Sequence, residues 1–174
     1  MGSVVAILQV LKYPHENLRK MAEPVLNIDD NIKKLVQDMF ETMYALNGVG
    51  LAATQVNQHV RVVVIDISEE RNQPIVLINP VITAQEGMVQ GEEGCLSLPG
   101  IYETVTRAER VKVTAINLDE ETFSLEADGL LSRCIQHELD HLQGKVFVNY
   151  LSRLKQNRVK TKLIKQSKIR EKAQ

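Results

Sequence analysis

Residues 137–141 read His-Glu-Leu-Asp-His and form the pattern in this chain with the clearest chemical meaning. On a helix, His137 and His141 lie one turn apart on the same face, so both imidazoles can bind one metal ion. Glu138 lies beside them, where it can reach a metal-bound water without being a ligand. The pattern is typical of hydrolases in which a metal activates water. The alternative is a solvated helix face, but two of the four histidines fall in this one motif.

A catalytic site of this kind needs a third protein ligand. Phe147 stands where a metzincin protease has its third histidine, and Glu171 is the only acidic residue after the motif. We therefore expect the third ligand upstream of the motif. Cys95 is the favoured candidate. Cys134, three residues before the motif on the same helix, is the rival, although a free cysteine is often only part of a core.

A helix over about residues 30–46 is predicted before the glycine-rich segment that begins at Gly48. Asp29 and Asp30 are N-cap candidates, and Gly48 can end the helix. Its apolar residues recur three and four positions apart, which places them on one face. They are Ile32, Leu35, Val36, Met39, Phe40 and Met43.

The metal motif is predicted to lie on a second helix over residues 129–142. Asp128 is its N-cap candidate, and Gly144 can end it. Its expected apolar face consists of Leu130, Leu131, Cys134, Ile135 and Leu142.

Runs rich in β-branched residues predict strands between the two helices. The expected strands cover residues 61–67, 75–78, 111–118 and 123–127, with a short one at 146–148. Residues 4–11 are predicted to form an opening strand or an extended apolar segment, and residues 84–107 to be irregular. Because helices and strands come in separate blocks, the predicted fold class is α+β.

The composition is that of one globular domain, since 174 residues can bury a sizeable core. No apolar run reaches the length of a membrane span. The first residues, including Met1, lack the features of a secretion signal, and two cysteines do not indicate a disulfide framework. We therefore expect a cytoplasmic protein.

The charge is unevenly distributed along the chain. Residues 151–174 hold nine of the 21 basic residues and one of the 22 acidic residues. This segment is predicted to form a basic helix over about residues 151–172. A cationic helix can bind a phosphate-rich surface; the alternative is a solvated helix on the surface of the domain.

Three segments together resemble motifs of the peptide deformylase family. They are residues 48–55 (Gly-Val-Gly-Leu-Ala-Ala-Thr-Gln), 93–97 (Glu-Gly-Cys-Leu-Ser) and 136–141 (Gln-His-Glu-Leu-Asp-His), and their order and spacing match over nearly the whole chain. The resemblance implies one catalytic domain over residues 1–174, with the metal helix packed among antiparallel strands and a C-terminal helix. It also implies the activity, which is removal of the N-formyl group from the N-formylmethionine of newly synthesised polypeptides, with release of formate.

The resemblance further implies roles for individual residues. The implied metal ligands are Cys95, His137 and His141. Glu138 would be the general base and then the acid, while the Gln55 side-chain amide and the Leu96 backbone N–H would form an oxyanion hole. The implied natural metal is Fe(II), with Zn(II), Ni(II) or Co(II) also accepted.

Methionine specificity requires an apolar pocket beside the metal, and core packing is the alternative role for its candidate residues. The candidates are Val49, Gly50, Gly94, Leu130, Arg133 and Cys134. The chain departs from the family pattern at Arg133, where relatives usually have an apolar residue, at Gly91, often Ile, and at Tyr102, often Arg. We expect the Arg133 stem to cover the pocket rim and its head to meet substrate carbonyls or solvent. Glu93 and Arg107 are expected to form an ion pair that steadies the cysteine loop.

For an enzyme that acts on emerging chains, the basic tail predicts the ribosome as partner, and neither a membrane nor DNA is expected. Two other functions remain open at this point. One is a metallopeptidase that cleaves unformylated peptides. The other is a protein with a structural metal or a ribosome-binding role, whose metal would need Cys134 or Asp140 as a fourth ligand.

Overall fold

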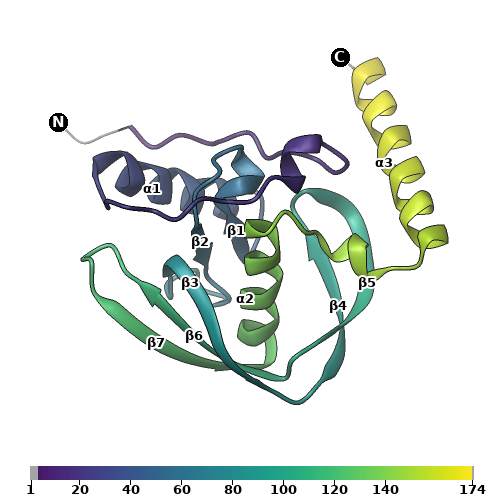
Figure 1. Cartoon of the computed structure of the whole chain (residues 1–174). Helices are drawn as coiled ribbons and strands as arrows, with labels where there is room; N and C mark the ends of the chain where they lie inside the picture. The colour runs from purple at the N-terminus through teal and green to yellow at the C-terminus, as the bar shows by residue number, and fades with distance from the viewer. Residues whose placement is uncertain (1–3, 174) are drawn as a thin grey trace.

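The computed structural model describes residues 4–173, so the first three residues and the last one lie outside this description. Its centre is an antiparallel five-stranded sheet in the order β1-β2-β3-β6-β7 (Figure 1). The strands are β1 (Gly50–Ala52), β2 (Val62–Ile65), β3 (Ile75–Glu86), β6 (Arg110–Ile116) and β7 (Thr122–Asp128). Two further strands, β4 (Val89–Cys95) and β5 (Leu98–Arg107), form a separate antiparallel pair. The predicted α+β class is confirmed.

Two helices cover opposite faces of the large sheet, α1 (Asp30–Ala45) and α2 (Gly129–Leu142). Successive side chains of a strand point to opposite faces. In β2, Val62 and Val64 accordingly lie in the apolar core that contains α1, whereas Val63 and Ile65 lie in the core that contains α2. In Figure 1, α2 runs through the middle of the molecule, between the large sheet and the β4–β5 pair. The metal motif is thus enclosed on two sides.

Helix α1 matches its prediction closely. The Asp29 carboxylate accepts a hydrogen bond of 3.0 Å from the Ile32 N–H, which satisfies one of the free donors of the first turn. Val36, Met39 and Met43 are buried on the predicted face.

Helix α2 also begins and ends where the sequence predicts, but its N-terminus lacks the side-chain capping bond that α1 has. Asp128 occupies the N-cap position without a capping hydrogen bond from its side chain. Gly144 follows the helix with φ of 76°, and a Cβ there would come within 2.2 Å of the Arg19 carbonyl oxygen. Leu130, expected on the apolar face, is 54% exposed.

The prediction of irregular structure over residues 84–107 was wrong. This segment contains the end of β3 and the β4–β5 pair. Leu98, Ile101 and Val105 of β5 are buried in a third apolar core. Strand β4 has the sequence Val-Gln-Gly-Glu-Glu-Gly-Cys, so glycines and acidic residues hide the alternation by which a strand is recognised.

The short strand expected at residues 146–148 is also absent, because this segment forms the 3-10 helix η3 (Phe147–Tyr150). The Val146 N–H donates a 2.8 Å hydrogen bond to the Asn149 side chain, which closes this turn. Val146, Phe147 and Val148 are all buried. Three consecutive buried residues fit a tight turn that is covered on all sides and do not fit a strand with one exposed face.

The N-terminal segment is extended and belongs to no strand. It lies along α1, where the Leu8 N–H donates to the Thr42 hydroxyl at 2.8 Å. Further along, the Leu11 N–H donates to the Gln55 carbonyl at 2.7 Å and the Tyr13 N–H to the Ser97 carbonyl at 2.8 Å. Residues 4–11 therefore follow the second of the two alternatives, an extended segment. Two short 3-10 helices, η1 (Glu16–Arg19) and η2 (Ala53–Val56), complete the fold.

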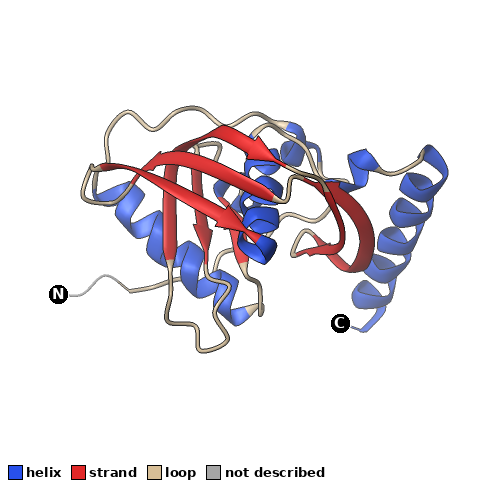
Figure 2. Ribbon diagram, turned by 90° about the horizontal axis from the view of Figure 1, so that it is seen from below, coloured by secondary structure: helices blue, strands red, loops and turns tan. Residues whose placement is uncertain are grey.

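Helix α3 (Arg153–Ala173) lies at the edge of the molecule, beyond the β4–β5 pair (Figure 2). Val159 and Leu163 are its buried residues and pack into the third core, whereas Leu154 and Ile169 are largely exposed. Among residues 4–173 no helix has both the length and the apolar character that crossing a membrane requires.

Candidate metal centre

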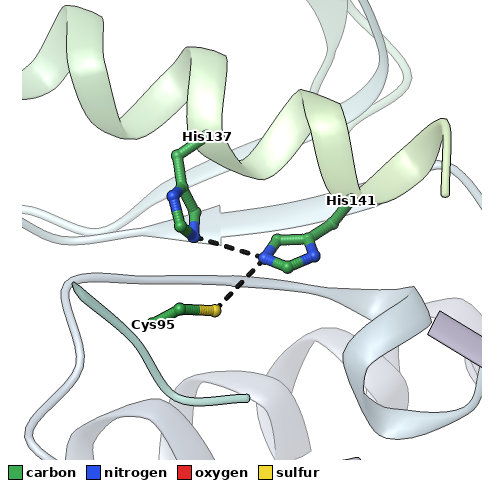
Figure 3. A group of neighbouring side chains, drawn as sticks. All are labelled: Cys95, His137 and His141. Carbon is green, nitrogen blue, oxygen red and sulfur yellow. Dashed lines mark hydrogen bonds between the residues drawn. The ribbon is translucent and has the colours of Figure 1, made fainter. Parts of the chain in front are cut away.

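Three side chains that are distant in the sequence converge between α2 and the end of β4 (Figure 3). The Cys95 Sγ lies 3.3 Å from the His141 Nε2, which lies 3.2 Å from the His137 Nε2. All three ligand atoms are within 4.8 Å of one another. The two histidines are four residues apart on α2, and the end of β4 brings Cys95 close to them. The three side chains thus share one point, at which thiolate and imidazole ligands would hold a metal ion.

Glu93 fixes the orientation of the His137 ring. One of its oxygens lies 2.8 Å from the His137 Nδ1, which leaves the Nε2 facing the other two ligands. A carboxylate in this position is the usual outer partner of a metal-binding histidine. Arg107 donates two hydrogen bonds of 2.8 Å to Glu93, so the predicted ion pair is confirmed. Burial alone would raise the pKa of Glu93, but the Arg107 and His137 hydrogen bonds lower it to about 2.

The electrostatics of the cluster favour a bound cation. Burial alone would lower the pKa of His137, yet Cys95, Glu93 and Glu138 raise it well above its ordinary value. His141 is almost fully buried, and burial lowers its pKa far enough to keep its imidazole neutral. Neutral imidazole is the form that binds a metal. The surroundings of His137 therefore attract positive charge, and the donor set fits a divalent metal.

Neither candidate for a fourth ligand faces the cluster. Cys134 is buried, and its Sγ lies 3.8 Å from the Val49 carbonyl oxygen. Burial, together with Glu138, raises the pKa of its thiol, so Cys134 stays protonated. The Asp140 carboxylate accepts hydrogen bonds from Arg107 at 2.6 Å and from Tyr150 at 2.9 Å. Within residues 4–173 the cluster thus offers three ligands, as a catalytic site requires.

Glu138 lies next to the three ligands and is 3% exposed. Burial raises its pKa to about 7. One carboxylate oxygen lies 4.0 Å from the His137 Nε2, and the other makes no hydrogen bond within the described part of the chain. Gly50 of β1 leaves room for this carboxylate, because a Cβ there would lie 2.8 Å from it. Glu138 can therefore take up and release a proton near neutral pH.

The Gln55 amide contacts the cluster at Cys95. Its Oε1 accepts a 2.9 Å hydrogen bond from the Ala52 N–H, which fixes the orientation of the amide. Its Nε2 is thereby directed at the Ser97 hydroxyl, at 3.1 Å, and the Cys95 Sγ, at 3.4 Å. A fixed N–H donor beside a metal can stabilise an oxyanion. Leu96, the other expected donor, lines the cavity described next.

A cavity of about 650 Å³ opens beside the cluster. All six residues predicted to bind substrate line it, namely Val49, Gly50, Gly94, Leu130, Arg133 and Cys134. Lys12 and Arg170 also line it, and the sequence did not predict them. Because these two residues come from opposite ends of the chain and belong to no motif, only the fold reveals them.

Arg133 differs from its prediction. The residue lines the cavity, but its guanidinium lies against Glu93 and the backbone of the β4–β5 pair instead of facing substrate or solvent. The Nη1 donates to the Glu93 carboxylate at 2.7 Å. The head thus belongs to the network behind the metal ligands.

Comparisons with known proteins agree with this geometry. The family model described as polypeptide deformylase matches residues 7–157. A peptide deformylase of Neisseria meningitidis is 61% identical over 164 residues, which is 94% of this chain and 98% of that protein. A peptide deformylase of Pseudoalteromonas translucida is 56% identical, over 96% of this chain and the whole of that protein.

Solved structures give the same result. A peptide deformylase from Legionella pneumophila superposes with a TM-score of 0.92 at 45% identity, covering 95% of this chain and 98% of that one. A peptide deformylase from Ehrlichia chaffeensis in complex with actinonin has a TM-score of 0.90 at 38% identity, covering 93% and 98%.

Proposed function

Since this chain belongs to the polypeptide deformylase family, we propose that it works through a divalent metal ion held by Cys95, His137 and His141, with Glu138 as the proton carrier. It is a hydrolase that removes the N-formyl group from the N-formylmethionine of newly synthesised polypeptides. The observation that carries the proposal is the convergence of the three ligand atoms within 4.8 Å beside a buried carboxylate.

A divalent metal ion bound at this site lowers the pKa of water and so supplies a nucleophile near neutral pH. Glu138 takes the proton from the attacking water, because its buried carboxylate lies next to the three ligands. The oxygen of the water bonds to the formyl carbon, and the C–N bond of the formamide then breaks. Glu138 returns the proton to the leaving nitrogen, which frees formate and the methionine amine.

The Gln55 amide and the Leu96 N–H donate hydrogen bonds to the formyl oxygen as negative charge develops on it. Gln55 is held in place before the reaction by the Ala52 N–H, so it needs no reorganisation. Val49, Leu130 and the Arg133 stem form the walls around the methionine side chain, and Gly50 and Gly94 expose their backbone to the extended peptide. Cys134 is buried in the core and also lines the cavity, so it completes this wall.

The native metal under this proposal is Fe(II), with Zn(II), Ni(II) or Co(II) able to replace it, and the protein acts in the cytoplasm. One thiolate and two imidazoles suit iron and zinc alike, so iron rests on the family resemblance. Metal analysis of protein purified without oxygen tests this part. Iron at one ion per chain supports it, and zinc alone contradicts it.

The activity is tested by formate release from formyl-Met-Ala-Ser, with protein prepared anaerobically with Fe(II). We expect rapid release that requires metal and disappears in Glu138→Ala. Unformylated Met-Ala-Ser is the control for the peptidase alternative, and we expect it to remain intact. Cleavage of that peptide, or no formate release from protein with a full complement of metal, would overturn the proposal.

We also propose that α3 binds the ribosome, since it carries nine basic residues and one acid beyond residue 150, and most of its length is exposed. Deleting α3 would uncover the third core, because Val159 and Leu163 are buried there. Neutralising the exposed residues Lys160, Lys165 and Lys168 with glutamine avoids this problem.

The triple glutamine variant should bind ribosomes at least tenfold more weakly and hydrolyse short formyl-peptides at the normal rate, because removing cations weakens binding to phosphates about additively. A matched control replaces Lys20, Lys33 and Lys112, which are exposed elsewhere. Equal loss of ribosome binding in both variants would show that net charge alone is responsible.

A further inference from the structure

Arg133 lies one helical turn before His137 on the same face of α2, and its guanidinium is almost enclosed. The side chain is 11% exposed. The Nη1 donates to Glu93 at 2.7 Å and to the Val105 carbonyl at 2.9 Å, and the Nη2 donates to the Val89 carbonyl at 2.9 Å. An arginine held by acceptors of both strands of the β4–β5 pair has one well-defined position.

Gly91 provides the space for this guanidinium. A Cβ on Gly91 would lie 2.9 Å from the Arg133 Cζ and 3.0 Å from its Nε and Nη2. Gly91 has no positive φ, so its backbone would accept alanine. The absence of a side chain at this position is therefore a matter of volume, and any larger residue must displace the Arg133 head.

Glu93 connects this pair to the metal centre. Its Oε2 accepts from the Arg107 Nε at 2.8 Å and from Arg133, while its Oε1 accepts from the Arg107 Nη2 and lies 2.8 Å from the His137 Nδ1. Arg107 donates hydrogen bonds to both oxygens of the carboxylate. Arg133 donates a further hydrogen bond to the Oε2, the oxygen that does not contact the histidine. Hydrogen bonds from two arginines hinder rotation of the carboxylate, and a fixed carboxylate fixes the imidazole.

We propose that Gly91 and Arg133 act as one unit that locks Glu93 and, through it, the His137 ring, so that Arg133 is a positioning residue for the metal centre. The proposal rests on the proposed role of His137 as a metal ligand. It assigns to Arg133 a task behind the ligands, in addition to its place in the wall of the cavity.

The competing explanation is purely structural. The hydrogen bonds to Val89 and Val105 tie α2 to the β4–β5 pair, so losing them would destabilise the fold whatever happens at the metal. Stability and metal affinity must therefore be measured separately.

The first test is Arg133→Met, which keeps an unbranched apolar stem and removes the donors. Co(II) serves as the probe, and its affinity is measured by competition with a chelator, beside the melting temperature of the metal-free protein. We expect Co(II) to bind about tenfold more weakly, at the lower end of the 10- to 100-fold effects of groups that orient metal ligands. A lower melting temperature with unchanged Co(II) affinity would show a structural tie alone and overturn the proposal.

The second test is Gly91→Ala, alone and combined with Arg133→Met. Because alanine acts only by displacing the Arg133 head, we expect the single variant to weaken Co(II) binding as Arg133→Met does, and the double variant to be no weaker than either. Gln90→Ala, at the exposed neighbouring position, is the matched control and should bind Co(II) normally. Losses that add in the double variant would overturn the idea of one unit.

These measurements are independent of the reaction. If the wild-type protein binds Co(II) tightly but releases no formate, the proposed function fails. The coupling of Gly91 to Arg133 can still be measured from the Co(II) affinities of the variants. If the wild type is active and both variants bind Co(II) normally, the positioning role alone fails.

Discussion

Helices α1 and α2 pack on opposite faces of the same sheet, yet their buried residues are of different kinds. The buried side chains of α1 are mostly apolar, with Met39 and Met43 fully enclosed. Helix α2 buries an apolar side against the sheet and a polar side, on which His137 contacts Glu93 of β4 and Glu138 lies against Gly50 of β1. In the apolar core under α1 the fit of side-chain volumes decides which residues are tolerated, whereas on the polar side of α2 the hydrogen-bond partners decide. Asp38 and Thr42 are the buried polar exceptions of α1, and both accept hydrogen bonds from the N-terminal segment.

The largest expected effect comes from a substitution in α2 that changes the reaction rate without lowering the stability. Glu138→Gln should lower the rate of formate release by about 100- to 10,000-fold, the usual contribution of a general acid–base group. The melting temperature should not fall, because the substitution removes a buried carboxylate of which one oxygen has no partner within residues 4–173. Steady-state kinetics and thermal unfolding measure the two effects. A large drop in melting temperature would show that Glu138 also supports the fold.

The opposite result is expected in α1. Met39→Ala leaves a cavity in a closed apolar core and should cost about 2–5 kcal/mol of unfolding free energy. The rate per folded molecule should remain near normal, because Met39 belongs neither to the metal cluster nor to the lining of the cavity. Urea unfolding gives the first quantity, and kinetics on the soluble fraction gives the second. Loss of activity without loss of stability would break the contrast between the helices.

The smallest effect concerns the helix ends. Asp29→Ala removes a capping hydrogen bond of 3.0 Å and should cost about 1 kcal/mol. Asp128→Ala is its matched counterpart in α2 and should cost less, because the Asp128 side chain makes no capping bond. Urea unfolding of the two variants side by side measures the difference. Equal costs would mean that the charge at the helix N-terminus matters more than the hydrogen bond.

The contrast between the helices also explains what the sequence could predict. Helix α1 could be predicted from the spacing of its apolar residues and from its N-cap residue, because both are local signals in the sequence. The three residues of the candidate metal cluster could be named from the sequence, because the motif of α2 is local and Cys95 lies in a recognisable segment. The β4–β5 pair was missed, because Gly91 and Glu93 are there to meet Arg133 and Arg107, which lie far away in the sequence. The position of the Arg133 head could not be predicted for the same reason.

The extended N-terminal segment offers a way to observe the metal centre from outside. Its Leu11 amide is held by the carbonyl of Gln55, and its Tyr13 amide by the carbonyl of Ser97, the two residues whose side chains meet beside Cys95. Exchange of these two amide protons with deuterium therefore requires local opening next to the site. Their exchange rates would report how rigidly that wall of the active site is held, without any label, ligand or substitution in the site itself.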